Sequence, residues 1–290
     1  MSATALAVSW LPPARPSGPL LYYTVFYREL GRERPPQTMR VPAEEGEALV
    51  GLAGMAELRP LAEGTTYEAW VTAHSAAGEG ESSAPQPATT TARAGVRVLS
   101  FGLWARVGCG RALRLACTWR GDPPPRARWL RADRPLTHDP RARLTPLGHL
   151  ALHEVDASTS GNYTCSARNT YGSEEVTYRV ECLPPPAPPA MTLMHADHST
   201  ARLAWRTAHH AIAPPHGFTI SWSRLREDNI ETEQTRIEME ERTIEMGSEA
   251  SSVVLRSLSC GATYSVKAVA HSRAGTSSPS APLLVKTKPP

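Results

Sequence analysis

Short runs of the chain alternate large apolar with polar residues, and segments rich in glycine and proline separate these runs. In residues 23–27 (YTVFY), large side chains recur at every second position, the period of a β-strand with one buried face. Residues 61–71 place Gly64 at a turn and Tyr67 six residues after Leu61. The chain also contains 27 prolines and only 6% aromatic residues, which favours short strands joined by turns. The pattern predicts an all-β protein.

The first and last thirds of the chain carry the same pattern, which indicates an internal repeat. A constant offset of 195 residues relates one set of positions: Trp10, Tyr23, Val25 and Tyr27 correspond to Trp205, Phe218, Ile220 and Trp222. An offset of 197 relates a second set: Leu61, Gly64 and Tyr67 correspond to Leu258, Gly261 and Tyr264. Two copies of one unit therefore flank a different central module.

Each copy resembles the fibronectin type III module, with a tryptophan on its second strand and a tyrosine after an L-x-x-G turn. The resemblance predicts that Trp10 and Trp205 fill the two cores. It also predicts that Tyr67 and Tyr264 hold the crossover between sheets through a hydroxyl bond to upstream backbone. The first copy begins at the tryptophan strand, so the usual first strand is expected to be missing and the edge beside it partly exposed.

The central module contains Cys117, Trp129 twelve residues later, and Cys165 preceded by Tyr163. These are the marks of an immunoglobulin domain: a disulfide between the sheets, a tryptophan packed on it and a tyrosine corner. Thr159 stands where such domains usually carry an aspartate paired with arginine. Asp156 lies further upstream, so the usual ion pair is left open, although Arg143 stands in the sequence where the partner of that aspartate would lie.

These patterns predict three tandem β-sandwiches. The expected division is a fibronectin type III module at 1–94 without its first strand, an I-set-like immunoglobulin module at 95–183 and a fibronectin type III module at 184–290. The proline-rich segment 184–189 is expected to be a semi-rigid polyproline spacer.

Five cysteines allow at most two intramolecular pairs. The immunoglobulin pattern implies a Cys117–Cys165 disulfide. Cys109 and Cys182 should end the first and last strands of the same module, which run side by side in this fold, so a second disulfide between them is a candidate. Cys260 would then be the remaining free thiol.

Three candidate recognition features lie in the central module. Asn162-Tyr163-Thr164 is an N-glycosylation sequon, and strand alternation directs Asn162 outward. Arg120-Gly121-Asp122 spells the integrin-binding tripeptide on an expected exposed loop, although a simple turn explains the same residues. The module carries 13 Lys and Arg against 8 Asp and Glu, with ten arginines between Arg106 and Arg143. This charge makes heparan sulfate a candidate partner, while an ordinary solvated surface is the alternative.

Several function classes are not expected. The sequence has none of the sequence motifs of catalytic or nucleotide-binding sites, so no enzyme and no cofactor is predicted. Cysteine and histidine spacings are not those of a zinc site, and no aromatic residues interleave with the arginines as in nucleic-acid readers. No run of 18 apolar residues and no signal peptide is visible. A membrane attachment is therefore expected only through segments outside this chain.

The chain resembles the Dscam (Down syndrome cell adhesion molecule) family over essentially its full length. The order fibronectin–immunoglobulin–fibronectin is shared, and the phrases that carry the resemblance are 115–117 (LAC), 153–156 (HEVD), 161–165 (GNYTC), 169–172 (NTYG), 216–220 (HGFTI) and 258–264 (LSCGATY). The match is to the fourth fibronectin repeat, the tenth immunoglobulin domain and the fifth fibronectin repeat of that family.

The resemblance implies a homophilic neuronal or immune surface receptor that guides neurite patterning, located on the extracellular face of the plasma membrane. This piece would belong to the membrane-proximal stalk, since the variable homophilic contacts lie in other domains of the family. Alternative hypotheses are an intracellular sarcomeric scaffold of the same modules and an integrin-binding or heparan-sulfate-binding immunoglobulin module.

Overall fold

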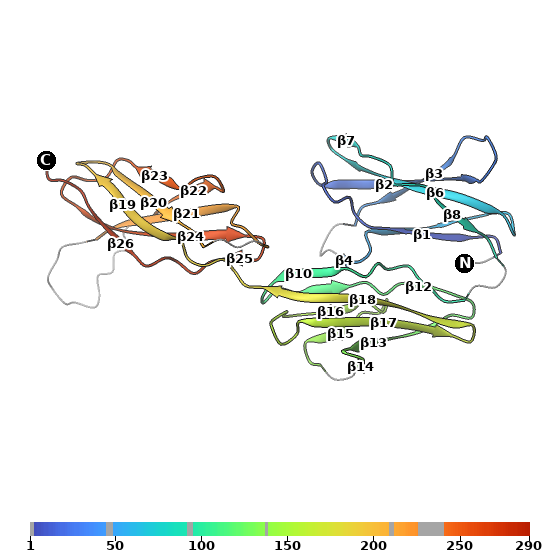
Figure 1. Cartoon of the computed structure of the whole chain (residues 1–290). Helices are drawn as coiled ribbons and strands as arrows, with labels where there is room; N and C mark the ends of the chain where they lie inside the picture. The colour runs from blue at the N-terminus through green and yellow to red at the C-terminus, as the bar shows by residue number, and fades with distance from the viewer. Residues whose placement is uncertain (1–2, 45–48, 92–94, 137–138, 209–211, 226–240) are drawn as a thin grey trace. The chain divides into compact units, whose positions relative to one another are not determined.

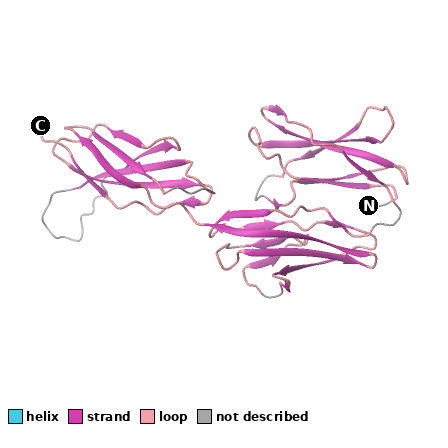
Figure 2. Cartoon of the chain, viewed as in Figure 1, coloured by secondary structure: helices cyan, strands magenta, loops and turns pink. Residues whose placement is uncertain are grey.

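The computed structural model describes residues 3–44, 49–91, 95–136, 139–208, 212–225 and 241–290. Every regular element in these residues is a β-strand, which confirms the predicted all-β class (Figure 2). No helix in the described part of the chain could cross a membrane. The chain forms two compact units: Met1–Arg106 together with Gly110–Glu181, and Val107–Cys109 together with Cys182–Pro290.

The first module packs a two-stranded sheet against a larger one. The order β1-β5 makes the first sheet, and β3-β2-β6-β7, with β8 on β6, makes the second (Figure 1). Among the described residues, no strand pairs with the other edge of β1. The strands are β1 (Leu6–Trp10), β2 (Leu20–Glu29), β3 (Gln37–Pro42), β4 (Leu49–Val50), β5 (Gly54–Leu58), β6 (Thr66–Ser75), β7 (Gly78–Glu79) and β8 (Gln86–Thr89).

Alternation along β2 builds the core of this module. Tyr23, Val25 and Tyr27 are buried, at 3%, 0% and 7% exposure, while the residues between them are only partly covered. Trp10 from β1 packs against Tyr23, with ring centroids 5.5 Å apart. The period-two run in the sequence is therefore the inner face of a strand, as predicted.

The central module is a sandwich of a five-stranded sheet, β10-β18-β17-β13-β14, and a smaller sheet, β15-β16-β11, to which β4 adds a fourth strand. A short pair, β12-β9, completes it. The strands are β9 (Arg97–Val98), β10 (Trp104–Gly108), β11 (Leu113–Leu115), β12 (Trp119–Arg120), β13 (Arg126–Arg131), β14 (Arg134–Pro135), β15 (Ala142–Leu144), β16 (Leu150–Leu152), β17 (Gly161–Asn169) and β18 (Gly172–Leu183).

Strand β4 of the first module pairs in parallel with β11 of the central module, within the same compact unit. The N–H of Ala116 donates to Val50 O (2.9 Å), and the N–H of Phe101 donates to Gly51 O (2.8 Å). Gly51 has φ +88°, and a side chain there would meet the hydroxyl of Tyr178 and the carbonyl oxygen of Phe101. Glycine is thus required where the two backbones meet.

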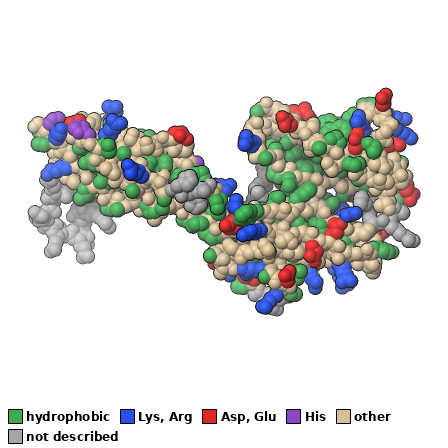
Figure 3. All heavy atoms as spheres, viewed as in Figure 1, with side chains coloured by type: hydrophobic (Ala, Val, Ile, Leu, Met, Phe, Trp, Pro, Cys, Tyr) green, Lys and Arg blue, Asp and Glu red, His purple; other side chains and the backbone are tan. Residues whose placement is uncertain are grey.

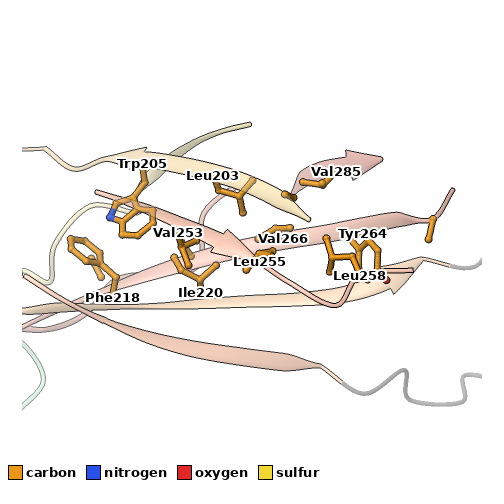
Figure 4. Close-up of a cluster of buried hydrophobic side chains, with 14 residues drawn as sticks. Leu203, Trp205, Phe218, Ile220, Val253, Leu255, Leu258, Tyr264, Val266 and Val285 are labelled. Atoms are coloured by element: carbon orange, nitrogen blue, oxygen red, sulfur yellow. The ribbon is translucent and has the colours of Figure 1, made fainter. Parts of the chain in front are cut away.

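The last module repeats the first with one more strand in its smaller sheet, β19-β20-β23, opposite β22-β21-β24-β25 with β26 on β24. Its core is a layer of side chains between the two sheets, from Trp205 and Phe218 to Tyr264 (Figure 4). The strands are β19 (Ala190–Ala196), β20 (Ala201–Arg206), β21 (Gly217–Leu225), β22 (Arg242–Gly247), β23 (Ser252–Leu255), β24 (Thr263–Ser272), β25 (Gly275–Thr276) and β26 (Leu283–Lys286).

Candidate functional site

The centre of the immunoglobulin module is a disulfide covered by aromatic rings. Cys117 and Cys165 are fully buried and bonded to each other. Trp129 on β13 lies directly opposite Cys165 on β17 and donates its indole N–H to Gly148 O (2.9 Å). The ring of Tyr178 lies 6.0 Å from that of Trp129. This arrangement fills the space between the sheets around the disulfide with apolar side chains.

Tyr163 forms the corner at the start of β17. Its side chain is completely buried, and its hydroxyl donates to Thr159 O (2.7 Å). Burial removes the phenolate from water and raises the pKa of Tyr163 above its usual value. The group therefore stays protonated and acts as a hydrogen-bond donor that closes the turn before the strand.

Asp156 supplies the acid of this turn in place of residue 159, and its charged partner is Arg141. Its carboxylate accepts from Arg141 Nη1 (2.8 Å), Ser158 Oγ (2.6 Å) and the N–H of Thr159 (2.9 Å). The Ser158 and Thr159 hydrogen bonds, with a contribution from the Arg141 charge, lower the pKa of Asp156 to about 2. Arg143 is exposed on β15 and forms no ion pair within the described residues.

A second disulfide joins Cys109 and Cys182, whose Cα atoms lie 4.8 Å apart. Cys109 follows β10 and Cys182 lies near the end of β18, and the N–H of Cys109 also donates to Leu183 O (3.0 Å). Both cysteines belong to the second compact unit. Cys260 is exposed and is the free cysteine of the described residues.

Asn162 is exposed on the outer face of β17. It lies directly opposite Arg179 on β18, and Thr164, the third residue of the sequon, bonds through its hydroxyl to that of Thr177 (2.8 Å). The neighbouring Tyr163 and Cys165 point into the core, so the outward direction of Asn162 follows from alternation. The side chain of Asn162 is therefore exposed to solvent.

The tripeptide 120–122 is not presented as one exposed loop, in contrast to the expectation. Arg120 belongs to strand β12, opposite Arg97 on β9, and is only partly exposed, with its guanidinium bonded to Trp119 O (3.2 Å). Gly121 is tightly surrounded, and only Asp122 is exposed. Arg120 and Asp122 therefore do not project together from a turn, and the geometry gives the integrin hypothesis no support.

The arginines of the module divide into two groups. Four arginines form ion pairs with nearby acids: Arg97 with Glu174, Arg106 with Glu181, Arg131 with Asp139, and Arg141 with Asp139 and Asp156. The remaining arginines between 111 and 143 form none within the described residues. Lys and Arg side chains are visible on the surface around β13 and β14 (Figure 3). No group of three or more metal-ligating side chains occurs in the residues that the structure describes.

The aromatic anchors of the two outer modules occupy equivalent places. Trp10 and Trp205 are 7% and 5% exposed. The hydroxyl of Tyr67 accepts from the N–H of Ala62 (3.0 Å), and that of Tyr264 accepts from the N–H of Ser259 (2.8 Å). Each tyrosine thus ties its strand to backbone five residues upstream.

Two domain-family models match the chain. The model "Fibronectin type III domain" matches residues 1–89 and 186–286, and "Immunoglobulin I-set domain" matches residues 104–182. The predicted class of tandem fibronectin type III and immunoglobulin sandwiches is therefore confirmed.

Curated relatives match nearly the whole chain. Cell adhesion molecule DSCAML1 of Gallus gallus is 30% identical over 94% of this chain, and Cell adhesion molecule Dscam2 of Drosophila melanogaster is 29% identical over 99%. The chain spans 13% of the length of each. A solved structure of titin domains A168–A170 covers 99% of the chain, and the chain covers 94% of it, at 15% identity and a TM-score of 0.48. A likeness at that level bears on neither function nor location.

The relatives are cell adhesion molecules with no enzymatic role, and they match the chain across all three modules. The chain belongs to the Dscam family of cell adhesion molecules, built from fibronectin type III and immunoglobulin domains.

Proposed function

We propose that the chain is a non-enzymatic segment of a cell-adhesion receptor ectodomain and serves as a spacer near the membrane. The observation that carries this proposal is the similarity to adhesion molecules over 94–99% of the chain. The segment would correspond to the fourth fibronectin repeat, the tenth immunoglobulin domain and the fifth fibronectin repeat, with limits at 1–94, 95–183 and 184–290. The parent protein would lie on the extracellular face of the plasma membrane, anchored by segments outside this chain.

The chemistry of the central module supports an extracellular location. Disulfides persist in oxidising compartments and are rare in the cytosol. We propose that Cys117–Cys165 and Cys109–Cys182 both form in the secreted protein and that Asn162 carries an N-linked glycan. Each cysteine pair is already within bonding geometry, and Asn162 is exposed. Cys260 would remain a thiol.

Homophilic recognition by the parent receptor would reside outside these 290 residues. The spacer proposal therefore expects the purified, secreted chain to sediment as a monomer at micromolar concentration. Beads coated with it should not aggregate, whereas beads coated with a longer ectodomain that includes the amino-terminal immunoglobulin domains should. Aggregation of beads that carry this chain alone would contradict the spacer role.

The unpaired arginines favour heparan sulfate as a second binding function of the immunoglobulin module. Arg126, Arg128 and Arg168 are exposed and form no ion pair within the described residues. Fixed positive charge of this kind attracts polyanions at the cell surface. Retention of the whole chain on heparin at physiological ionic strength is the expected result, and elution in the flow-through would contradict it.

A further inference from the structure

One face of the five-stranded immunoglobulin sheet points away from the core and carries arginines from two adjacent strands. On β13, Trp129 is buried while Arg126 and Arg128 are exposed, so both arginines stand on the outer face. On β17, the exposed Arg168 lies directly opposite Arg126. Three guanidinium groups therefore share one end of the outer face.

This end of the face is not neutralised from within the chain. Like charges at directly opposed positions destabilise an antiparallel pair, and Arg126 and Arg168 occupy such positions. The described residues provide no ion pair to Arg126, Arg128 or Arg168. Glu175 on β18 lies opposite Ser166, one strand away from Arg128, and is the acid on this part of the face. An anion supplied from outside would offset the repulsion between the arginines.

The other end of the same face carries two arginines, of which Arg106 is paired with Glu181, and an exposed aromatic ring. Trp104 on β10 is 49% exposed, and the guanidinium carbons of Arg106 and Arg179 lie 3.5 and 4.6 Å from the centre of its ring. Arg179 is level with Asn162, six residues along β17 from Arg168. At the rise of a β-strand this separates the two basic ends by about 20 Å.

A linear polyanion fits this spacing better than a small anion, which would reach only one end. Guanidinium groups bind sulfate and carboxylate groups through paired hydrogen bonds, and an indole beside them offers an apolar edge to a sugar ring. Sulfated glycosaminoglycans combine these features in a repeating chain. An acidic peptide would supply the charge but not the sugar rings.

We propose that Arg126, Arg128, Arg168 and Arg179, named here the arginine face, bind a sulfated glycosaminoglycan laid along the outer side of the immunoglobulin sheet. This assigns residues to the heparan sulfate binding proposed above and rests on it. Arg126, Arg128 and Arg168 are the main anchor. Arg179 contributes less, because a glycan on the facing Asn162 restricts access to it.

The test uses the whole secreted chain and a heparin-derived oligosaccharide in titration calorimetry at physiological ionic strength. The variant R126S/R128S/R168S should bind about tenfold more weakly, the effect expected when three exposed charge contacts are lost together. The control R111S/R143S/R202S removes the same charge from exposed positions elsewhere and should bind within about twofold of the unsubstituted chain. Thermal unfolding of each variant checks that the modules remain folded.

The possible results of this experiment distinguish binding at the arginine face from heparan sulfate binding elsewhere on the chain. Equal weakening by both triple variants would overturn the arginine face but leave heparan sulfate binding in place. Failure of the unsubstituted chain to bind would overturn both. Displacement of the oligosaccharide by polyglutamate of the same charge at the same concentration would show that charge alone is recognised and would overturn the assignment to a sulfated sugar. In the N162Q variant, which lacks the glycan, substitution of Arg179 should have a larger effect than in the glycosylated chain.

Discussion

The two fibronectin type III modules share a core but differ at one edge. Trp10 and Tyr23 meet at a centroid distance of 5.5 Å and an interplanar angle of 58°, and Trp205 and Phe218 meet at the same distance and angle. The smaller sheet, however, has two strands in the first module and three in the last. The same aromatic packing is therefore built where the tryptophan strand has one strand neighbour, β1 with β5, and where it has two, β20 with β19 and β23.

The edge that differs is apolar in the first module. A groove of about 380 Å³ runs along β1 and is lined by residues of β1, β6, β8 and the segment before β8, with Leu58 of β5; Leu6, Val8 and Trp10 are among them. In the last module, β19 pairs with β20 along its length and packs Met191 and Leu193 on the core. The comparison shows what a strand at this edge adds: hydrogen bonds for the backbone and apolar cover for the core.

The first module has an extra strand at one point of the shared order. Strand β4 lies between β3 and β5 and pairs with β11, whereas the described residues form no strand between β22 and β23. The first module is therefore held partly by its neighbour, and the last by its own extra strand.

Replacing the core tryptophan with alanine should affect hydrogen-exchange protection differently in the two fibronectin type III modules. Trp10→Ala and Trp205→Ala should each cost about 3–5 kcal/mol of unfolding free energy, the usual cost of deleting a large core side chain. Because β1 has one strand partner, W10A should abolish hydrogen-exchange protection in β2 and β6, while W205A leaves part of the protection in β21 and β24. The partly exposed Trp70 provides the control, W70A, with a smaller loss. If W10A and W205A lose hydrogen-exchange protection equally, the number of strands beside the tryptophan strand does not affect the stability of the module.

Gly51→Ala should break the contact between β4 and β11. Alanine at φ +88° costs about 1–2 kcal/mol, and its Cβ would also meet Tyr178 and Phe101. Exchange should accelerate at the amides of Ala116 and Phe101, which donate across this contact. Gly31, at φ +82° with open space around it, gives the matched control G31A, which carries only the conformational cost. If G51A and G31A change amide exchange at Ala116 and Phe101 equally, the contact between β4 and β11 does not stabilise the first module.

The tyrosine corners should be nearly equivalent in the two copies. Tyr67→Phe and Tyr264→Phe each remove one hydrogen bond to a backbone N–H and should cost about 1 kcal/mol. The loss should be slightly larger for Tyr264, which is 7% exposed, whereas Tyr67 is only partly covered. Urea unfolding monitored module by module by hydrogen exchange measures both. A cost in one copy alone would show that the repeat is not energetically equivalent at this position.

The smallest expected difference between the two modules is in their stability at acidic pH. Asp197, just after β19, binds Lys288 Nζ (3.0 Å) and His195 Nε2 (2.9 Å), and these contacts lower its pKa. A lowered folded-state pKa gives stability that is present above the unfolded pKa of about 3.9 and is lost as the pH falls through the folded value. The last module should lose a little stability in that range, and Asp197→Asn should remove the pH dependence. An unchanged pH profile in D197N would contradict this role.

The sequence predicted the positions that a strand's period determines. Trp10, Trp129, Tyr163 and Trp205 are buried as expected, because alternation and spacing, together with the resemblance to known modules, identify core aromatic residues. The sequence left the ion pair of this turn open; Arg141, just before β15, pairs with Asp156, and this contact depends on where β15 begins. The position of Arg120 in β12 was missed, because the short pairing with β9 has no periodic signal.

Contacts between distant segments were the least predictable. Nothing in residues 49–51 indicates pairing with β11, since a two-residue strand has no pattern of its own. The arginine face was visible only as an excess of charge in the sequence. The register of β13 against β17 placed Arg126 opposite Arg168. Charge can be counted from a sequence, but its arrangement on a sheet needs the pairing.

The central claim, that this is an extracellular adhesion segment stabilised by two disulfides, is tested most directly by peptide mapping without reduction. The chain would be expressed in a secreting cell, digested and analysed by mass spectrometry. The account predicts a Cys117–Cys165 peptide, a Cys109–Cys182 peptide, a free Cys260 and a glycan on Asn162. Free thiols at all five cysteines and an unmodified Asn162 would contradict it and would favour the intracellular scaffold.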